Sequence, residues 1–101
     1  MTLSPPNDPF AIPLEAFNRD MVVNTTSAFV AAQQAVLGFA ELPEHAAKSF
    51  FFTGNILNVA VLPSFMSAGV GKSASAHMMM AAAAAYKDRG YKYAILYSVI
   101  V

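Results

Sequence analysis

An α/β fold with parallel strands, in the order helix–strand–helix–strand, is predicted for this chain of 101 residues. Three observations predict it. Apolar residues recur at three- and four-residue spacing in the first half of the chain, which is typical of a helix. Residues 48–53 and 91–98 are short apolar runs with aromatic and β-branched residues, as in strands. The alanine-rich segment between the two runs is long enough for a helical crossover, which places successive strands parallel.

Residues 1–13 are predicted to form an extended arm. Prolines dominate this segment, and proline lacks a backbone N–H and biases the residue before it away from helix. They are Pro5, Pro6, Pro9 and Pro13. The remaining residues, 14–101, are assigned to one α/β domain.

The first helix is predicted over residues 14–41 and ends before Pro43. One apolar stripe along it comprises Leu14, Phe17, Met21, Ala28, Ala32, Val36 and Phe39. A second stripe comprises Val22, Phe29, Val30 and Leu37. A helix that is apolar on two sides should be buried on two sides. One side should therefore cover the sheet, and the other should meet a second helix or a second subunit.

The first strand, residues 48–53, is almost unbroken in its apolar character, which is typical of a strand buried on both faces of a parallel sheet. A loop over 56–64 leads to a second helix over 64–89, which is rich in alanine, the best helix former. Gly90 is a candidate C-terminal cap for this helix. Two strands do not make a stable parallel sheet by themselves. We therefore expect the chain to be part of a larger fold or of an oligomer.

The composition limits the classes of function. Hydrophobic residues make up 56% and charged residues 12% of the chain, against averages of roughly 45–50% and 25%. The surplus of apolar side chains favours association. The formal net charge is zero and no basic cluster is present, which argues against nucleic acid as a partner. The absence of cysteine excludes disulfides and thiolate metal sites.

The sequence shows neither a secretory signal nor a run of 18 apolar residues. No transmembrane helix is predicted, and a cytoplasmic location is expected.

Three polar residues stand where a ligand site of an α/β fold would lie. Asn24 falls in the middle of the first helix, where asparagine is a poor helix former, and a structural polar contact is favoured over a catalytic role. Asn55 follows the first strand and either contacts a ligand or completes a turn. Lys72 lies near the start of the second helix, where a cation opposes the helix dipole. It either holds a ligand or is a solvated surface residue.

Two further patterns do not predict sites. Gly71-Lys72-Ser73 is not a phosphate-binding loop, because that motif needs a glycine where this chain has Met66. His77 is followed by three methionines, but one helical turn cannot direct all four side chains to one ion. Core packing is favoured there, and no metal site is predicted.

The spacing Asn24 … Asn55 … Ala68-x-x-x-Lys72 resembles the short-chain dehydrogenase/reductase family. The segments VVNTTSAFVAAQQAVLGF, FFFTGN and GVGKSASAHMM are similar to an atypical, fungal-type branch of it, and the resemblance covers roughly residues 14–95. It implies a partial Rossmann-like, doubly wound fold of NAD- or NADP-dependent oxidoreductase ancestry. It also implies that Asn24, Asn55 and Lys72 occupy the family's catalytic positions, with Lys72 and Asn55 beside the cofactor.

The chain departs from the family at the catalytic positions. Asn55 stands where the family has serine, and Ala68 stands where it has the catalytic tyrosine. Alanine cannot provide the proton that carbonyl reduction requires, and an asparagine amide can only polarise the carbonyl. The family's glycine-rich cofactor turn is also missing, so a C-terminal-half fragment of the fold is expected.

Two functions are compatible with this pattern. The first is an inactive fragment of oxidoreductase ancestry. The alternative is a non-catalytic pseudoenzyme or oligomerisation segment. In the resembled family the corresponding two helices commonly pack across a two-fold axis, which implies a homo-oligomer formed through the two long helices.

Overall fold

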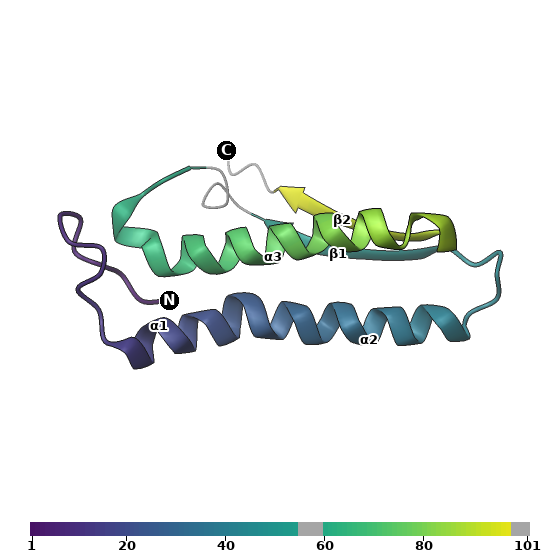
Figure 1. Cartoon of the computed structure of the whole chain (residues 1–101), viewed down its shortest axis with the longest axis horizontal. Helices are drawn as coiled ribbons and strands as arrows, with labels where there is room; N and C mark the ends of the chain where they lie inside the picture. Colours follow the sequence, from purple (N-terminus) through teal and green to yellow (C-terminus); the bar gives the residue numbers. More distant parts are fainter. Residues whose placement is uncertain (55–59, 98–101) are drawn as a thin grey trace.

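The computed structural model describes residues 1–54 and 60–97. A long helical segment comes first, formed by α1 (Leu14–Met21), a π-helical turn (Val22–Thr26) and α2 (Ser27–Glu41). It is followed by β1 (Lys48–Gly54), a 3₁₀ turn (Pro63–Phe65), α3 (Met66–Ala85), a second 3₁₀ turn (Lys87–Arg89) and β2 (Tyr91–Tyr97). Figure 1 shows α1 and α2 in one line beside α3, with both strands next to the C-terminal half of α3. The described chain is thus an α/β structure in which helical segments and strands alternate.

The two strands pair in parallel, as predicted. Lys48 lies opposite Tyr91, and Gly54 lies opposite Tyr97. The strand predicted over 48–53 continues for one more residue, to Gly54. The strand predicted over 91–98 is present as far as Tyr97, and residue 98 lies outside the described residues.

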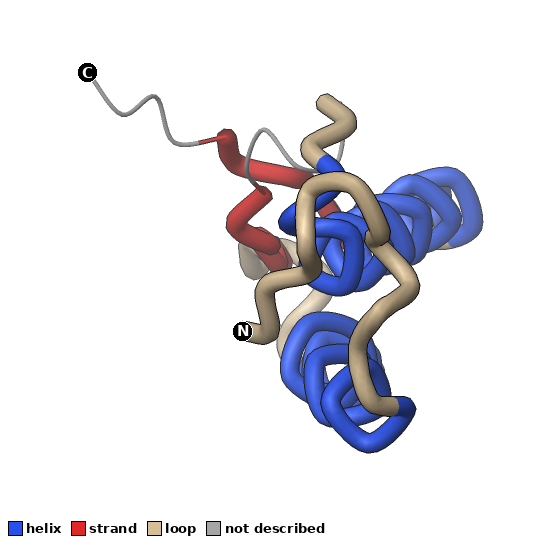
Figure 2. The backbone as a smooth tube through the Cα atoms, turned by 90° about the vertical axis from the view of Figure 1, so that its left-hand side faces the viewer, coloured by secondary structure: helices blue, strands red, loops and turns tan. Residues whose placement is uncertain are grey.

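The core lies between one face of this sheet and the two long helices. Met79 of α3 is 1% exposed and packs with Tyr91 and Tyr93 of β2. The partly buried side chains around this cluster are Ala32, Ala35, Val36, Phe39, Phe50, Phe52, Met78, Ala82, Ala83, Tyr86 and Ile95. They come from both strands and both helices, and Figure 2 shows the strands on one side of the helices.

The opposite face of the sheet is uncovered. Phe51 of β1 is 57% exposed and Leu96 of β2 is 52% exposed. The prediction that the first strand is buried on both faces is therefore wrong for the described chain. The physical reason is that α2 and α3 both pack against the face that carries Phe50, Phe52 and Tyr93.

An aromatic cluster joins α2, α3 and β2 at the core. The ring centroids of Phe39 and Tyr91 are 5.3 Å apart, and those of Tyr86 and Tyr93 are 5.8 Å apart. The Tyr93 hydroxyl donates to the carbonyl of Ala32 at 3.0 Å. Burial raises the pKa of Tyr93, and the neighbouring Tyr86 and Tyr91 raise it further. The phenol therefore stays protonated and keeps its role as a donor.

The two apolar stripes of the first helix have different environments. The first stripe packs on the sheet through Val36 and Phe39, as predicted. The second stripe is largely open: Val22, Phe29, Val30 and Leu37 are 48–59% exposed. Burial on two sides is thus not found within the chain, because nothing in the described residues covers the second stripe.

The predicted helix bounds are close, but the helices are less regular than expected. The segment 14–41 is helical throughout and contains the π-helical turn, whereas the α-helix predicted over 64–89 is limited to Met66–Ala85, with 3₁₀ turns at both ends. Gly90 has a φ of 74° and ends the second of these turns, which confirms the predicted cap.

The N-terminal arm folds back on itself, so the prediction of an extended arm is wrong. The Asp8 amide donates to Pro5 O and the Ala11 amide donates to Asp8 O, both at 3.1 Å. Pro6 and Pro9 are the second residues of these two turns, where the fixed φ of proline is favourable. Among the described residues, no helix combines the length and apolar character needed to cross a bilayer.

Candidate functional site

A cavity of about 200 Å³ lies where α1, the π-helical turn and α3 meet. Its walls are formed by Met1, Arg19, Asp20, Val23, Asn24, Ala68 and Lys72. Three of the sequence-predicted site residues, Asn24, Ala68 and Lys72, are thus brought together. The fourth, Asn55, follows the end of β1 and lies outside the described residues.

Lys72 reaches from α3 to the sheet. Its Nζ lies 5.2 Å from the centroid of the Phe52 ring, which is a cation–π contact. Phe52 is two residues from Gly54, the last residue of β1. The ammonium group is therefore directed to the carboxyl end of the strand, where α/β folds of this kind bind their ligands.

Asn24 lies in the π-helical turn and makes a structural polar contact. Its side-chain amide donates to the carbonyl of Asp20 at 3.0 Å. The hydroxyl of Ser75, on α3, donates to the carbonyl of Asn24. A π-helical turn disturbs the regular pattern of main-chain bonds. These two side chains provide partners for the carbonyl of Asp20, just before the turn, and for that of Asn24, within it. The structural contact predicted for Asn24 is present.

Gly71 allows α3 to approach the π-helical turn closely. A Cβ atom at this position would lie 2.5 Å from the Cβ of Asn24, which is too close for any other residue without movement. The Thr25 hydroxyl donates to Gly71 O at 3.2 Å, across the same contact. Sequence reasoning did not find this role of Gly71. The small residues Ala68, Gly71 and Ser75, at helical spacing, were the available signal.

Asp20 is a site residue that sequence reasoning also missed. Its side chain is 3% exposed, and its Oδ2 accepts a hydrogen bond from the Thr2 amide at 2.9 Å. Burial acts to raise the pKa of this carboxyl group, but the Thr2 amide, the nearby Ser67 hydroxyl and the positive N-terminus together lower the pKa below its ordinary value. Asp20 is therefore ionised at neutral pH. The available signal was an acid four residues before Asn24, within an otherwise apolar helix face.

The chemistry of this cavity suits binding better than proton transfer. Ala68 is 3% exposed and has no titratable group. Asp20 is ionised and has no proton to donate. The amide of Asn24 is engaged with Asp20 O. Arg19 and Lys72 remain as the cationic side chains that a ligand would meet. Within the parts of the chain that the structure describes, no group of three histidine, cysteine or acidic side chains is arranged to hold a metal ion.

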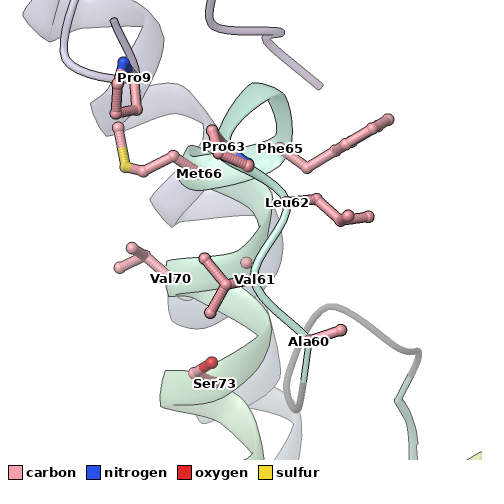
Figure 3. Close-up of a pocket in the computed structure, with 10 residues that line it drawn as sticks. Pro9, Ala60, Val61, Leu62, Pro63, Phe65, Met66, Val70 and Ser73 are labelled. Atoms are coloured by element: carbon pink, nitrogen blue, oxygen red, sulfur yellow. The ribbon is translucent and has the colours of Figure 1, made fainter. Parts of the chain in front are cut away.

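A larger cavity of about 430 Å³ lies on another face of α3 (Figure 3). The loop before α3 and α3 itself form most of its wall: Pro9, Ala60, Val61, Leu62, Pro63, Phe65, Met66, Gly69, Val70 and Ser73. None of the predicted site residues lines it. The described residues of its wall are uncharged and mostly apolar.

The comparison with known proteins bears on this arrangement. The short-chain dehydrogenase/reductase dmxR12 of Cryptosporiopsis sp. (strain 8999) is 51% identical to the chain over 86 residues, or 85% of its length. The chain is therefore similar to part of a short-chain dehydrogenase/reductase. The predicted resemblance is thus confirmed. The match covers 35% of dmxR12, so the chain spans about a third of that protein. No protein-family model matches the chain, and no solved structure matches it.

Proposed function

We propose that this chain is a part of a Rossmann-like, NAD- or NADP-dependent oxidoreductase fold that has no catalytic activity of its own. The observation that carries the proposal is the position of Ala68. It lines the same cavity as Asn24 and Lys72, and the resemblance aligns it with the family's tyrosine.

The missing acid accounts for the expected inactivity. Reduction of a carbonyl needs a hydride and a proton, and a positioned acid contributes roughly 10²–10⁴-fold to such a step. Neither Ala68 nor the ionised Asp20 supplies that proton. Asn55, beyond the end of β1, would polarise a carbonyl oxygen through its amide.

The residues fit one part of a nicotinamide cofactor. Lys72 presents its ammonium group beside the carboxyl end of β1, where it would donate to the ribose hydroxyl groups. The cofactor, when bound, would supply the hydride. The glycine-rich turn that holds the pyrophosphate in such folds is absent from these 101 residues. We therefore expect weak cofactor binding by this chain.

The test is the oxidation of NADPH and of NADH by the purified chain with a series of small ketones. We expect no loss of nicotinamide absorbance above that of a heat-denatured sample. Turnover of any ketone above this background would contradict the proposal. It would mean that some residue other than Ala68 donates the proton.

A second candidate function is self-association, which is favoured by the exposed second stripe of the first helix. Four large apolar side chains that are 48–59% exposed and follow one helix face are unusual on a monomer. We propose that the chain forms a homo-oligomer in which the π-helical turn, α2 and α3 of two copies pack together. If the same surface of each copy forms the contact, the two copies are related by a two-fold axis.

A further inference from the structure

The first residues of the chain lie beside the cavity that Lys72 lines, and Met1 is the one that forms part of its wall. Met1 forms part of the cavity wall together with Asn24, Ala68 and Lys72. Ser4 is buried, with 4% of its surface exposed. Figure 1 shows the N-terminal end of the chain between α1 and α3, the two helices that line the cavity.

Two hydrogen bonds hold this segment in place. The Thr2 amide donates to Asp20 Oδ2 of α1 at 2.9 Å. The Ser4 amide donates to the carbonyl of Ser64 at 2.8 Å. Ser64 belongs to the 3₁₀ turn that leads into α3. The segment is thus attached on both sides of the cavity, once to α1 and once to the start of α3.

The attachment is also easily released. Ser4 Oγ is buried and has no hydrogen-bond partner among the described residues, and a buried unpaired hydroxyl opposes the closed arrangement. Met1 and Leu3 are 74% and 59% exposed, so they bury little apolar surface when the segment is closed. Segments with few buried contacts open at low free energy.

We propose that residues 1–4 form a strap that restricts access to the Lys72 cavity. A ligand that reaches Lys72 through this cavity must first displace the strap. The inference goes beyond the proposed function and does not depend on it, because the accessibility of Lys72 can be measured whether or not the chain binds a nicotinamide cofactor.

The test measures how fast Lys72 reacts with an amine-directed acetylating reagent in the full chain, by mass spectrometry of peptides. Lys92 is exposed and Lys48 is buried, so they serve as internal references. In the unmodified protein we expect Lys72 to react more slowly than Lys92. Thr2→Pro removes the amide that donates to Asp20 and should raise the Lys72 rate roughly tenfold, the effect of one hydrogen bond to a charged group.

A second variant and a control complete the experiment. Asp20→Ala removes the acceptor and should raise the Lys72 rate in the same way. Asn7→Ala alters an exposed arm residue away from both attachment points and should leave the rate unchanged. If Lys48 also becomes reactive in Asp20→Ala, that variant has unfolded and Thr2→Pro decides. An unchanged Lys72 rate in Thr2→Pro, or equal rates for Lys72 and Lys92 in the unmodified chain, would overturn the proposal.

Discussion

The carboxyl group of Asp20 is ionised although it is buried, and burial disfavours the ionised form. The Thr2 amide, the Ser67 hydroxyl and the N-terminus outweigh that opposition and keep the pKa of the carboxyl group below its ordinary value of 3.8. A carboxyl group with a lowered pKa in the folded state favours the fold when it is ionised. The carboxylate therefore stabilises α1 and the arm that it attaches.

The first prediction concerns acid stability. The contribution of Asp20 is fully present above pH 3.8, the ordinary value, and is lost as the pH falls through the lower pKa of the folded state. Asp20→Asn should therefore lower the melting temperature at neutral pH and weaken its dependence on pH in the acid range. The measurement is thermal unfolding by circular dichroism across that range. Asp88→Asn, at an exposed position, should behave like the unmodified chain.

The second prediction concerns Lys48, which is 7% exposed at the start of β1. Its Nζ donates to the carbonyls of Pro43, Glu44 and Ala46 at 2.9, 3.1 and 3.4 Å, and so ties the α2–β1 connection to the strand. Lys48→Met would leave these carbonyls without their charged donor. We expect a loss of about 2 kcal/mol in the free energy of unfolding, measured with urea.

Lys87→Met is the matched control for this change. Lys87 is an exposed lysine in the second 3₁₀ turn, so its replacement should change stability by no more than about 0.5 kcal/mol. Equal effects of the two substitutions would show that the three contacts of Lys48 do not stabilise the chain.

At the scale of single residues, the sequence predicted those positions that a spacing pattern marks. Asn24, Ala68 and Lys72 were predicted from the resemblance that their spacing carries, and they line one cavity. Asp20 and Lys48 were missed because their roles depend on main-chain groups that only the folded chain brings close. Asp20 meets an amide 18 positions away, and no local pattern encodes that contact.

At the scale of elements, the contact between the π-helical turn and α3 shapes the site. Gly71 allows the two segments to touch, and the hydrogen bond from Thr25 to Gly71 O closes the contact. Lys72 follows directly in α3. Its position beside Asn24 thus depends on a glycine at 71.

The third prediction tests this contact with a pair of glycine substitutions. Gly71→Ala would place a Cβ 2.5 Å from the Cβ of Asn24, and we expect a loss of about 1–3 kcal/mol in stability. Gly38→Ala, in α2, meets nothing within 4 Å and should stabilise the chain by up to about 1 kcal/mol. Urea unfolding of both variants is the measurement. If both substitutions stabilise the chain, the contact between α3 and the π-helical turn is less tight than the structure indicates.

The spacing of apolar residues predicted the helices and strands, because each element buries the side chains of one face and these recur at a fixed spacing. It did not predict the π-helical turn, since the apolar stripe resumes on the same side after Thr25, the one polar residue in it. The 3₁₀ ends of the second helix were missed for a similar reason. Alanine and lysine favour helix in general but do not distinguish an α-helical from a 3₁₀ last turn.

At the scale of the whole molecule, the described chain leaves two apolar surfaces open. One is the sheet face that carries Phe51 and Leu96. The other is the second stripe of the first helix. Composition predicted a surplus of apolar surface, but it did not predict its location. The chain spans about a third of dmxR12, and the sheet face is where further layers of an α/β fold would pack.

The last prediction concerns association through the second stripe. Phe29 and Leu37 also line a groove of about 460 Å³ between α2 and α3, so the exposed helix face continues into a concave apolar surface. A helix of a second copy would fit such a surface, with ridges of side chains lying in the groove. We expect the purified chain to be a dimer or a higher oligomer by light scattering at micromolar concentration.

Charge placed on this face should separate the copies, because a buried unpaired carboxylate is strongly unfavourable. Phe29→Glu combined with Leu37→Glu should shift the mass towards that of the monomer while the far-ultraviolet circular dichroism stays helical. Ala31→Glu adds a charge at an exposed position of α2 that is not three or four residues from any residue of the second stripe, and it should leave the mass unchanged. A monodisperse monomer with cooperative thermal unfolding, before any substitution, would contradict the proposed oligomer and would show that the second stripe is stable in water.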